Sequence, residues 1–352
     1  MIQSAPAHAG LLRVRMFRAR GRPACATGVP AKIGAVLAVL LITFPFFALV
    51  LCGYLATRAR LLPLPAIGGL NAFVLYFALP CLLYRFGAST PIAQLLDPAA
   101  AGVYLLCALL MVGGTVLATR GPRTGWNDAA FGALVAAFPN TGFMGVPLLV
   151  ALLGAAAAGP VILTIAVDMV ITTSLCVALS RLDSAGTHGM AVALRHAFKG
   201  MATNPMPWSI ALGALASALQ FTLPGALDKT VAMLADAASP VALFTIGAVL
   251  ARSQMHQHER VPPRAYVPIA LAKLLLHPLL VWLVGQAALA LGAPLTPSTL
   301  AVLVLLAALP SASNVSLLAE RFGAHNGRIA HIILVSTALA FLSFSAAVAL
   351  LT

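Results

Sequence analysis

Ten long apolar segments occupy most of this 352-residue chain. A helix of about 20 apolar residues is long enough to cross the hydrocarbon core of a bilayer. The segments are longer than the strands of an outer-membrane barrel and lack their alternating pattern. We therefore predict an all-α integral membrane protein, with spans at residues 36–57, 66–87, 98–119, 128–153, 160–180, 205–223, 229–251, 265–290, 297–319 and 326–350.

The composition indicates lipid, not water, as the main solvent of the chain. Hydrophobic residues make up 61% of the sequence and charged residues 8%, whereas soluble domains carry about 25% charged residues. The polar segments between the spans are too short to form a soluble domain. A large water-soluble core is therefore excluded.

The basic residues are distributed one-sidedly. The net charge of +13 could indicate nucleic-acid binding, but most basic residues between spans lie in the loops after the odd-numbered ones. The loops after the even-numbered spans carry only Arg85 and Lys229. By the positive-inside rule, the loops rich in basic residues are cytoplasmic. We expect a multi-pass protein of the plasma or bacterial inner membrane, with both termini outside the cytoplasm and no nucleic-acid partner.

Residues 1–35 form a basic tail that on its own would favour the cytoplasm. It has no acidic residue, and its basic residues are Arg13, Arg15, Arg18, Arg20, Arg22 and Lys32. A secretory signal fits poorly, because the following apolar run continues through a full span. We expect native translation to start near residue 30. N-terminal sequencing of the native protein tests this, and an intact Met1 terminus would contradict it.

Two of the spans contain polar and helix-breaking residues at similar depth. An unpaired backbone group in lipid costs several kcal/mol, so such a break must face protein or a water-filled cavity. A pair of broken spans at matching positions in two halves is typical of a transporter binding site. We predict that the substrate-binding residues are Pro139, Asn140, Thr141 and Gly142 in the fourth span and Pro310, Ser311, Ser313 and Asn314 in the ninth.

The chemistry of a broken helix suits an anion. Proline removes a hydrogen bond of the helix and clashes with the preceding turn. The N–H groups at the start of the new half-helix carry partial positive charge, which favours a carboxylate. The alternative is a pair of ordinary proline kinks repaired by Ser and Thr side chains.

The chain divides into two halves of five spans each. We expect a first repeat at residues 36–180, a cytoplasmic connector at 181–203 and a second repeat at 204–352. Pro80 and Gly87 in the second span match Pro240 and Gly247 in the seventh. Because each half has an odd number of spans, the second copy must enter the membrane from the opposite side, which is an inverted repeat.

Ionisable residues inside spans are costly and are candidates for function. The candidates for binding a coupling proton or cation, such as sodium, are Asp168, Lys273, Asp236 and His277. Lys273 and His277 are four residues apart and so share one helix face. A buried ion pair between Asp168 and Lys273 is the structural alternative.

The sequence lacks the common signatures of catalysis. It has no GxxxxGK[ST], HExxH or GxSxG motif, so no enzyme activity and no cofactor are expected. The five cysteines are scattered and form no CxxC pair. Neither a metal site nor a disulfide framework is therefore predicted.

Several segments together resemble the auxin efflux carrier family, including bacterial members described as malate permeases. The first half carries LITFPFFALVLCGYLATRARLL, NAFVLYFALPCLL and FPNTGFMGVPLL. The second half carries NPMPWSIALGAL, ASPVALFTIGAVLA, KLLLHPLL and ALPSASNVSLLAERFG. The resemblance covers about residues 41–350, which is nearly everything beyond the basic tail.

This resemblance implies ten helices in two inverted five-helix repeats, with a scaffold part and a transport part. It also implies that the fourth and ninth spans cross at their prolines and that substrate binds beside the crossing. In this sequence the second asparagine, Asn314, stands four residues beyond its proline and not next to it. Because the long cytoplasmic loop of many plant relatives is absent, a small organic acid anion is expected in place of auxin.

Taken together, these patterns predict a secondary transporter that moves small carboxylates such as malate by alternating access. A homodimer joined by the scaffold helices is a further hypothesis. Two alternatives remain at this stage: a passive uniporter or channel for the same anions, and a membrane sensor that binds the anion without transporting it.

Overall fold

The computed structural model describes residues 31–89, 97–122, 124–154, 157–182, 205–255 and 261–351. Within these ranges the chain is helical and forms no β-strand, as the apolar segments predicted. Each of the ten expected segments contains helix. Residues 1–30 of the basic tail and nearly all of the expected connector lie outside the described residues.

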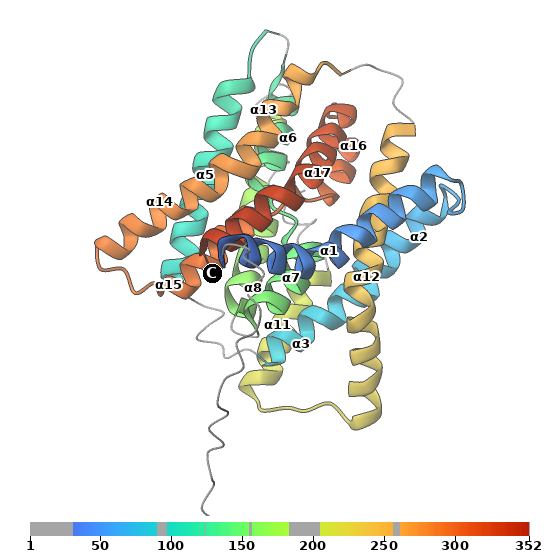
Figure 1. Cartoon of the computed structure of the whole chain (residues 1–352), viewed down its shortest axis with the longest axis vertical. Helices are drawn as coiled ribbons and strands as arrows, with labels where there is room; N and C mark the ends of the chain where they lie inside the picture. Colours follow the sequence, from blue (N-terminus) through green and yellow to red (C-terminus); the bar gives the residue numbers. More distant parts are fainter. Residues whose placement is uncertain are drawn as a thin grey trace, which may run out of the picture.

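The first half is built from the helices coloured blue to green in Figure 1, and several of them contain short π-helical turns. A π-turn inserts a residue into a helix and is frequent at functional sites. In chain order the elements are α1 (Ala31–Arg58), α2 (Ala66–Phe73), η1 (Val74–Ala78), α3 (Leu79–Ser89), α5 (Pro98–Thr119), α6 (Trp126–Ala137), η2 (Thr141–Gly145), α7 (Val146–Leu153), α8 (Ala158–Val167), η4 (Asp168–Thr172) and α9 (Thr173–Ser180).

The second half is also built from helices together with short helical turns. Its elements are α11 (Pro205–Ala218), α12 (Gly225–Met255), η6 (Pro263–Ala265), α13 (Val267–Leu271), η7 (Ala272–Leu276), α14 (His277–Ala290), α15 (Pro297–Ala307), α16 (Asn314–Arg321) and α17 (Asn326–Leu351). The helix of the fourth span ends at Ala137, and that of the ninth ends at Ala307, so both predicted interruptions are present.

Six continuous helices in the described ranges are long and apolar enough to cross a membrane unaided. They are Ala66–Ser89, Pro98–Thr119, Ala158–Ser180, Gly225–Arg252, Val267–Ala290 and Asn326–Leu351. Shorter apolar helices occupy Phe44–Arg58, Thr141–Leu153, Trp208–Ala218 and Pro297–Ala307. Many large apolar side chains on the outer faces of the long helices are exposed, for example Leu106, Leu109, Phe77 and Trp282, which is the pattern expected of a lipid-facing surface.

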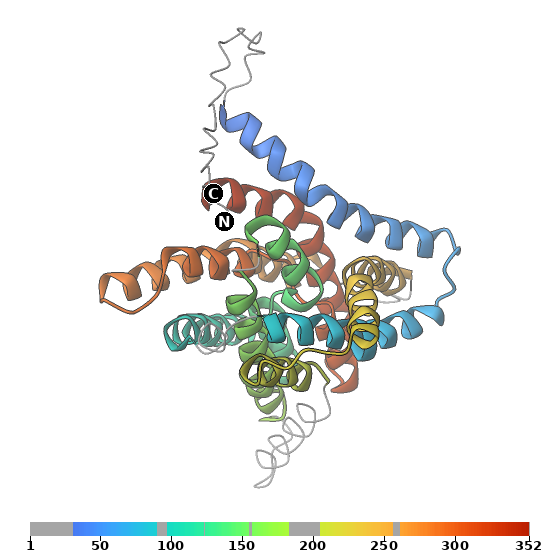
Figure 2. The same cartoon turned by 90° about the horizontal axis from the view of Figure 1, so that it is seen from below.

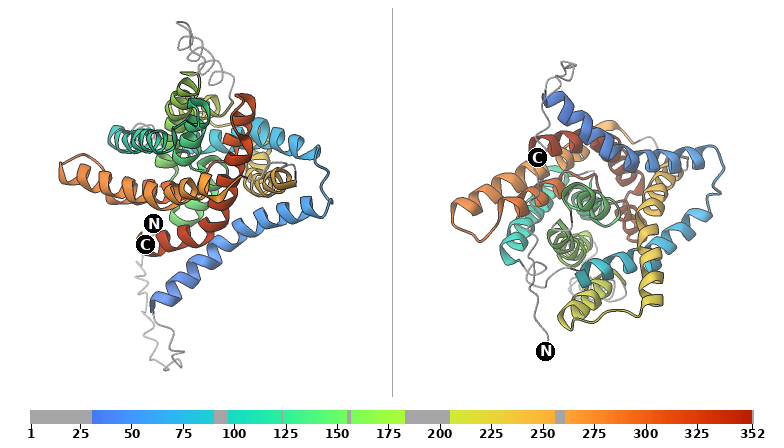
Figure 3. Two further views of the ribbon diagram at one scale, coloured as in Figure 1. Left: turned by 90° about the horizontal axis from the view of Figure 1, so that it is seen from above. Right: turned by 60° about the horizontal axis from the view of Figure 1, so that its bottom comes forward.

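The helices pack in two groups. In the first, α1 lies along α12, and α3 lies against both α11 and α12. Figures 2 and 3 show α1 and α2–α3 as two arms joined at one edge of the molecule, with α12 between them. The second group contains α5, α6, α8–α9, α13–α14, α15–α16 and α17. Contacts of α1 with α17 and of α12 with η2 join the two groups.

Glycines allow the helices of the first group to touch backbone to backbone. A Cβ atom on Gly247 of α12 would lie 1.8 Å from the Val50 carbonyl oxygen, and one on Gly53 of α1 would lie 1.9 Å from that of Phe244. Gly87 of α3 and Gly213 of α11 make an equivalent close contact. The glycines of the two proline–glycine landmarks, Gly87 and Gly247, therefore have the same packing role.

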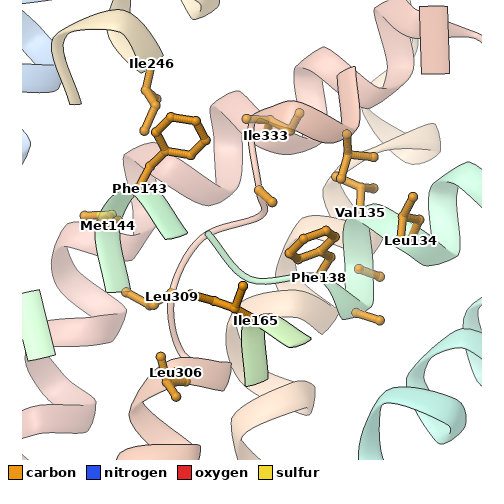
Figure 4. Packing of buried hydrophobic residues seen from close by; sticks show 14 of the residues in the cluster. Leu134, Val135, Phe138, Phe143, Met144, Ile165, Ile246, Leu306, Leu309 and Ile333 are labelled. Atoms are coloured by element: carbon orange, nitrogen blue, oxygen red, sulfur yellow. The ribbon is translucent and has the colours of Figure 1, made fainter. Parts of the chain in front are cut away.

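The main hydrophobic core surrounds the two helix breaks. Figure 4 shows Phe138, Leu306 and Leu309 next to the non-helical segments, with Phe143 against Ile246 of α12. Gly145 lets this packing close, because a Cβ there would lie 2.8 Å from Leu309 Cδ1. The breaks are thus held inside protein and are shielded from lipid.

Candidate functional site

The two interrupted spans meet at their breaks. Pro139 and Ser311 form an isolated antiparallel bridge. On one side of it the Asn140 N–H donates to the Pro310 carbonyl oxygen at 2.8 Å, and on the other the Ala312 N–H donates to that of Phe138 at 3.0 Å. Figure 4 shows the two non-helical segments side by side between Phe138 and Leu309. Each break therefore offers hydrogen-bond partners to backbone groups that the other break removes from a helix. Backbone at membrane depth requires such partners, because lipid offers none.

Pro139 explains the conformation of the first break. Proline has no N–H to give to the preceding turn, so α6 ends and the next N–H groups find other acceptors. The Thr141 N–H donates to the Pro139 carbonyl oxygen at 2.8 Å. The backbone of Asn140, with φ −77° and ψ 55°, has the geometry of an inverse γ-turn. The chain reverses tightly here before η2 begins.

The second break is completed by side chains from two other helices. In an uninterrupted helix the Ser311 N–H would donate to the Ala307 carbonyl oxygen. It donates instead to Ser336 Oγ of α17 at 3.2 Å. The Ala307 carbonyl accepts from Lys273 Nζ of η7 at 2.6 Å. An ammonium group at the C-terminal end of a helix is also favoured by the helix dipole.

Several polar side chains around the crossing lack hydrogen-bond partners. Buried polar atoms are normally paired, so each orphan needs an explanation. Asn140, Thr141 and Ser311 are each at most 2% exposed. The buried oxygen atoms without a partner include five on the two breaks and on α17, namely Asn140 Oδ1, Thr141 Oγ1, Ser311 Oγ, Asn314 Oδ1 and Thr337 Oγ1. Together these orphans are suited to a polar ligand or to bound water.

The other predicted binding residues lie at the same breaks. Gly142 is the second residue of η2, and a Cβ there would meet no heavy atom within 4 Å, which leaves open space beside the break. Ser313 precedes α16, and its carbonyl oxygen accepts from the Ser316 N–H. Sequence reasoning missed Ser336 and Thr337. The signal available was a pair of adjacent hydroxyl residues in an otherwise apolar span.

Three of the four ionisable candidates lie in one buried cluster. Asp168 Oδ2 accepts from Tyr104 Oη at 2.7 Å, and Asp168 Oδ1 accepts from Thr172 Oγ1 at 3.2 Å. Lys273 Nζ lies 3.2 Å from His277 Nδ1. The rings of Tyr104 and His277 are 6.2 Å apart between centroids. The cluster adjoins the crossing because Lys273 binds the end of α15.

The fourth candidate, Asp236, lies elsewhere. It is exposed on α12 and forms an ion pair with Arg85 of α3 at 3.3 Å. No ion pair within 4.0 Å joins the two described residues Asp168 and Lys273. Asp168 and Lys273 therefore do not form the direct ion pair considered from the sequence.

A family comparison agrees with this architecture. A family model described as membrane transport protein matches residues 38–348. The chain belongs to this family. It is the family of the auxin efflux carriers that the sequence motifs indicated.

Individual relatives align over most of their lengths. The chain is 32% identical over 303 residues to a protein of Rhizobium meliloti (strain 1021) named "Putative malonate transporter", which covers 85% of this chain and 91% of that protein. It is 28% identical over 287 residues to "Uncharacterized transporter YfdV" of Escherichia coli (strain K12), which covers 80% and 87% of the two chains. A protein of the same name from Shigella flexneri matches equally well. The chain is therefore a membrane transporter of this family.

Proposed function

We propose that this protein is a secondary transporter that carries small organic acid anions, with a malonate- or malate-like dicarboxylate as the substrate class. The observation that carries the proposal is the buried crossing at Pro139 and Ser311, surrounded by unpartnered polar oxygens. The relative named for malonate transport supports a dicarboxylate as the first substrate to test.

The crossing supplies what a carboxylate requires. The first turns of η2–α7 and of α16 begin at the breaks. The Thr141, Val315 and Ser316 N–H groups there already donate to backbone carbonyls, which leaves those of Gly142, Phe143 and Asn314 for a ligand. These groups, with the Asn140 amide and the hydroxyls of Thr141 and Ser311, would donate hydrogen bonds to the substrate. Helix N-termini add partial positive charge without a fixed cation in the site.

The two packing groups fit alternating access by a ten-helix inverted repeat. In that arrangement the contact between the first and seventh spans is equivalent to the contact between the sixth and second spans. Close glycine contacts occur in both helix pairs: Gly53 and Gly247 each lie against the facing backbone between α1 and α12, and Gly213 and Gly87 do so between α11 and α3. We assign the repeats to residues 36–180 and 204–352. The first packing group would be the scaffold, and the second would move with the substrate.

Asp168, Lys273 and His277 are proposed to link transport to a proton or another cation. Lys273 contacts the end of α15 directly, so a change in the charge of this cluster would act on the second break. We place the loops rich in basic residues on the cytoplasmic side of the bacterial inner membrane or the plasma membrane.

Counterflow in proteoliposomes tests the proposed function. Vesicles loaded with unlabelled malonate should accumulate labelled malonate, because a carrier exchanges the two, and a channel would not. Asn140→Ala, Ser311→Ala and Thr337→Val should each reduce this exchange at least tenfold. Ser345→Ala is the matched control: this buried hydroxyl lies on α17, about 12 Å along the helix from Thr337. Full exchange in all three folded variants would refute the site, and thermal stabilisation by malonate without any flux would indicate a sensor.

A further inference from the structure

A groove separate from the crossing lies between α5 and α13. It has a volume of about 780 Å³, and the first turns of α6 and α17 close its inner side. Figure 1 shows α5, α6 and α13 beside one another at one end of the molecule. None of the described residues that line it belongs to the two breaks. The groove is therefore distinct from the proposed substrate site.

The part of the groove farther from the first turns of α6 and α17 is apolar and opens sideways toward lipid. Leu110 of α5 and Leu276 of η7 line it and are 48% and 51% exposed. Both belong to helices long enough to cross the membrane. Gly114 and Ala118 form the α5 wall, and a Cβ on Gly114 would meet nothing within 4 Å. This apolar lining comes from two spans and is suited to contact with a hydrocarbon chain.

The part of the groove next to the first turns of α6 and α17 is cationic. Arg264 lines it and is exposed. Arg328 is largely buried there, where its Nε donates to the Ala265 carbonyl oxygen at 2.9 Å and its Nη1 to that of Asp128 at 3.4 Å. The carboxylate of Asp128 also lines the groove and accepts from the His325 N–H at 2.8 Å. The guanidinium of Arg328 offsets its charge, which leaves Arg264 as the net positive charge of the groove. The first turns of three helices, α6, α13 and α17, add partial positive charge at the same end.

We propose that this groove binds an anionic phospholipid, with the phosphate at Arg264 and the helix N-termini and one acyl chain along Leu110, Gly114 and Leu276. Basic pockets between spans on the cytoplasmic side of a membrane are suited to such head groups. The lateral opening favours a lipid over a soluble anion, because the exposed leucines at its base would contact hydrocarbon, not water. The site differs from the proposed substrate site in residues and in ligand.

The test measures thermal unfolding of delipidated full-length protein in detergent with added lipid. Phosphatidylglycerol should raise the melting temperature more than phosphatidylcholine does. Arg264→Gln should raise the concentration of phosphatidylglycerol needed for half the effect by about fivefold, since one basic residue near an anionic lipid surface contributes about that factor. Gly114→Leu should fill the apolar part of the groove and reduce the effect further.

Two matched variants make the result specific. Gly113→Leu makes the same change one residue earlier on α5, also with open space around its Cβ, but outside the groove lining. Arg58→Gln removes an exposed arginine from the end of α1. Both should respond to lipid as the unmodified protein does. Equal effects of the two lipids, equal behaviour of Gly114→Leu and Gly113→Leu, or a rise with inorganic phosphate that depends on Arg264 would each overturn the proposal.

Discussion

Replacing Lys273 by Met tests whether this side chain holds the second break in the shape that binds substrate. Lys273 is fully buried, and its Nζ donates to the Ala307 carbonyl oxygen at 2.6 Å. Met has similar length but no donor. The substitution leaves a buried carbonyl without a partner, which costs about 1–3 kcal/mol. It also removes a cation from the end of α15, where the helix dipole contributes about 0.3–1 kcal/mol.

The effects on substrate affinity and on stability should separate. Losing the hydrogen bond penalises the crossed conformation, and the apparent affinity falls with the fraction of protein in that conformation. A penalty of about 1–3 kcal/mol corresponds to an affinity loss of at most about 5- to 150-fold, reached when the crossed conformation is not already dominant. The free energy of unfolding should change less, because removing a buried ammonium also removes its desolvation cost.

Malonate titration of purified protein by calorimetry, with counterflow in proteoliposomes, measures the affinity loss. Lys273→Arg keeps a cationic donor and should recover part of the affinity. Lys229→Met removes an exposed lysine from the start of α12 and serves as the control. If folded Lys273→Met binds malonate as tightly as the unmodified protein, Lys273 does not hold the break and the reasoning is wrong.

Three further predictions follow from the packing and the charges. Gly247→Ala should destabilise the protein by about 1–3 kcal/mol, because its Cβ would overlap the backbone of α1; thermal unfolding beside Gly102→Ala, whose Cβ would meet open space, measures this. Asp168→Asn should weaken the dependence of malonate exchange on pH if this carboxylate carries the coupling proton, and an unchanged pH profile would remove it from that role. Breaking the exposed ion pair with Arg85→Gln or Asp236→Asn should change the free energy of unfolding by less than about 1 kcal/mol, and a larger loss in chemical denaturation would contradict this.

The helix breaks could be predicted because their cause is local. Pro139 and Pro310 stand in apolar runs, and proline cannot continue the hydrogen bonds of a helix. The sequence also placed Asn140, Thr141 and Ser311 beside those breaks. The family resemblance, not the residue pattern itself, implied that the two spans cross at their prolines. Neither provided the register of Pro139 with Ser311, because that register depends on two segments far apart in the chain.

The partners of the buried charges were equally hard to predict. Lys273 finds a backbone carbonyl, and Asp168 finds Tyr104 and Thr172. A sequence shows charges of opposite sign and suggests that they pair, but a freed helix end competes for the same ammonium. Asp236 shows the reverse error: it lies in an apolar span, yet its side chain is exposed and meets Arg85. Exposure depends on which face of a helix packs, and the neighbouring helices decide that.

The mutual hydrogen bonding of the two breaks has a consequence for biosynthesis. The Phe138 carbonyl and the Asn140 N–H form hydrogen bonds with the backbone of Ala312 and Pro310. These two residues leave the ribosome about 170 residues later. At about 5–20 residues per second, that interval lasts about 10–30 s. During it the first broken span has no partner and must be hydrated, held at the translocon or bound by a membrane chaperone. The crossing that organises the finished transporter can thus form only late in synthesis, and neither half of the chain should reach the native state alone.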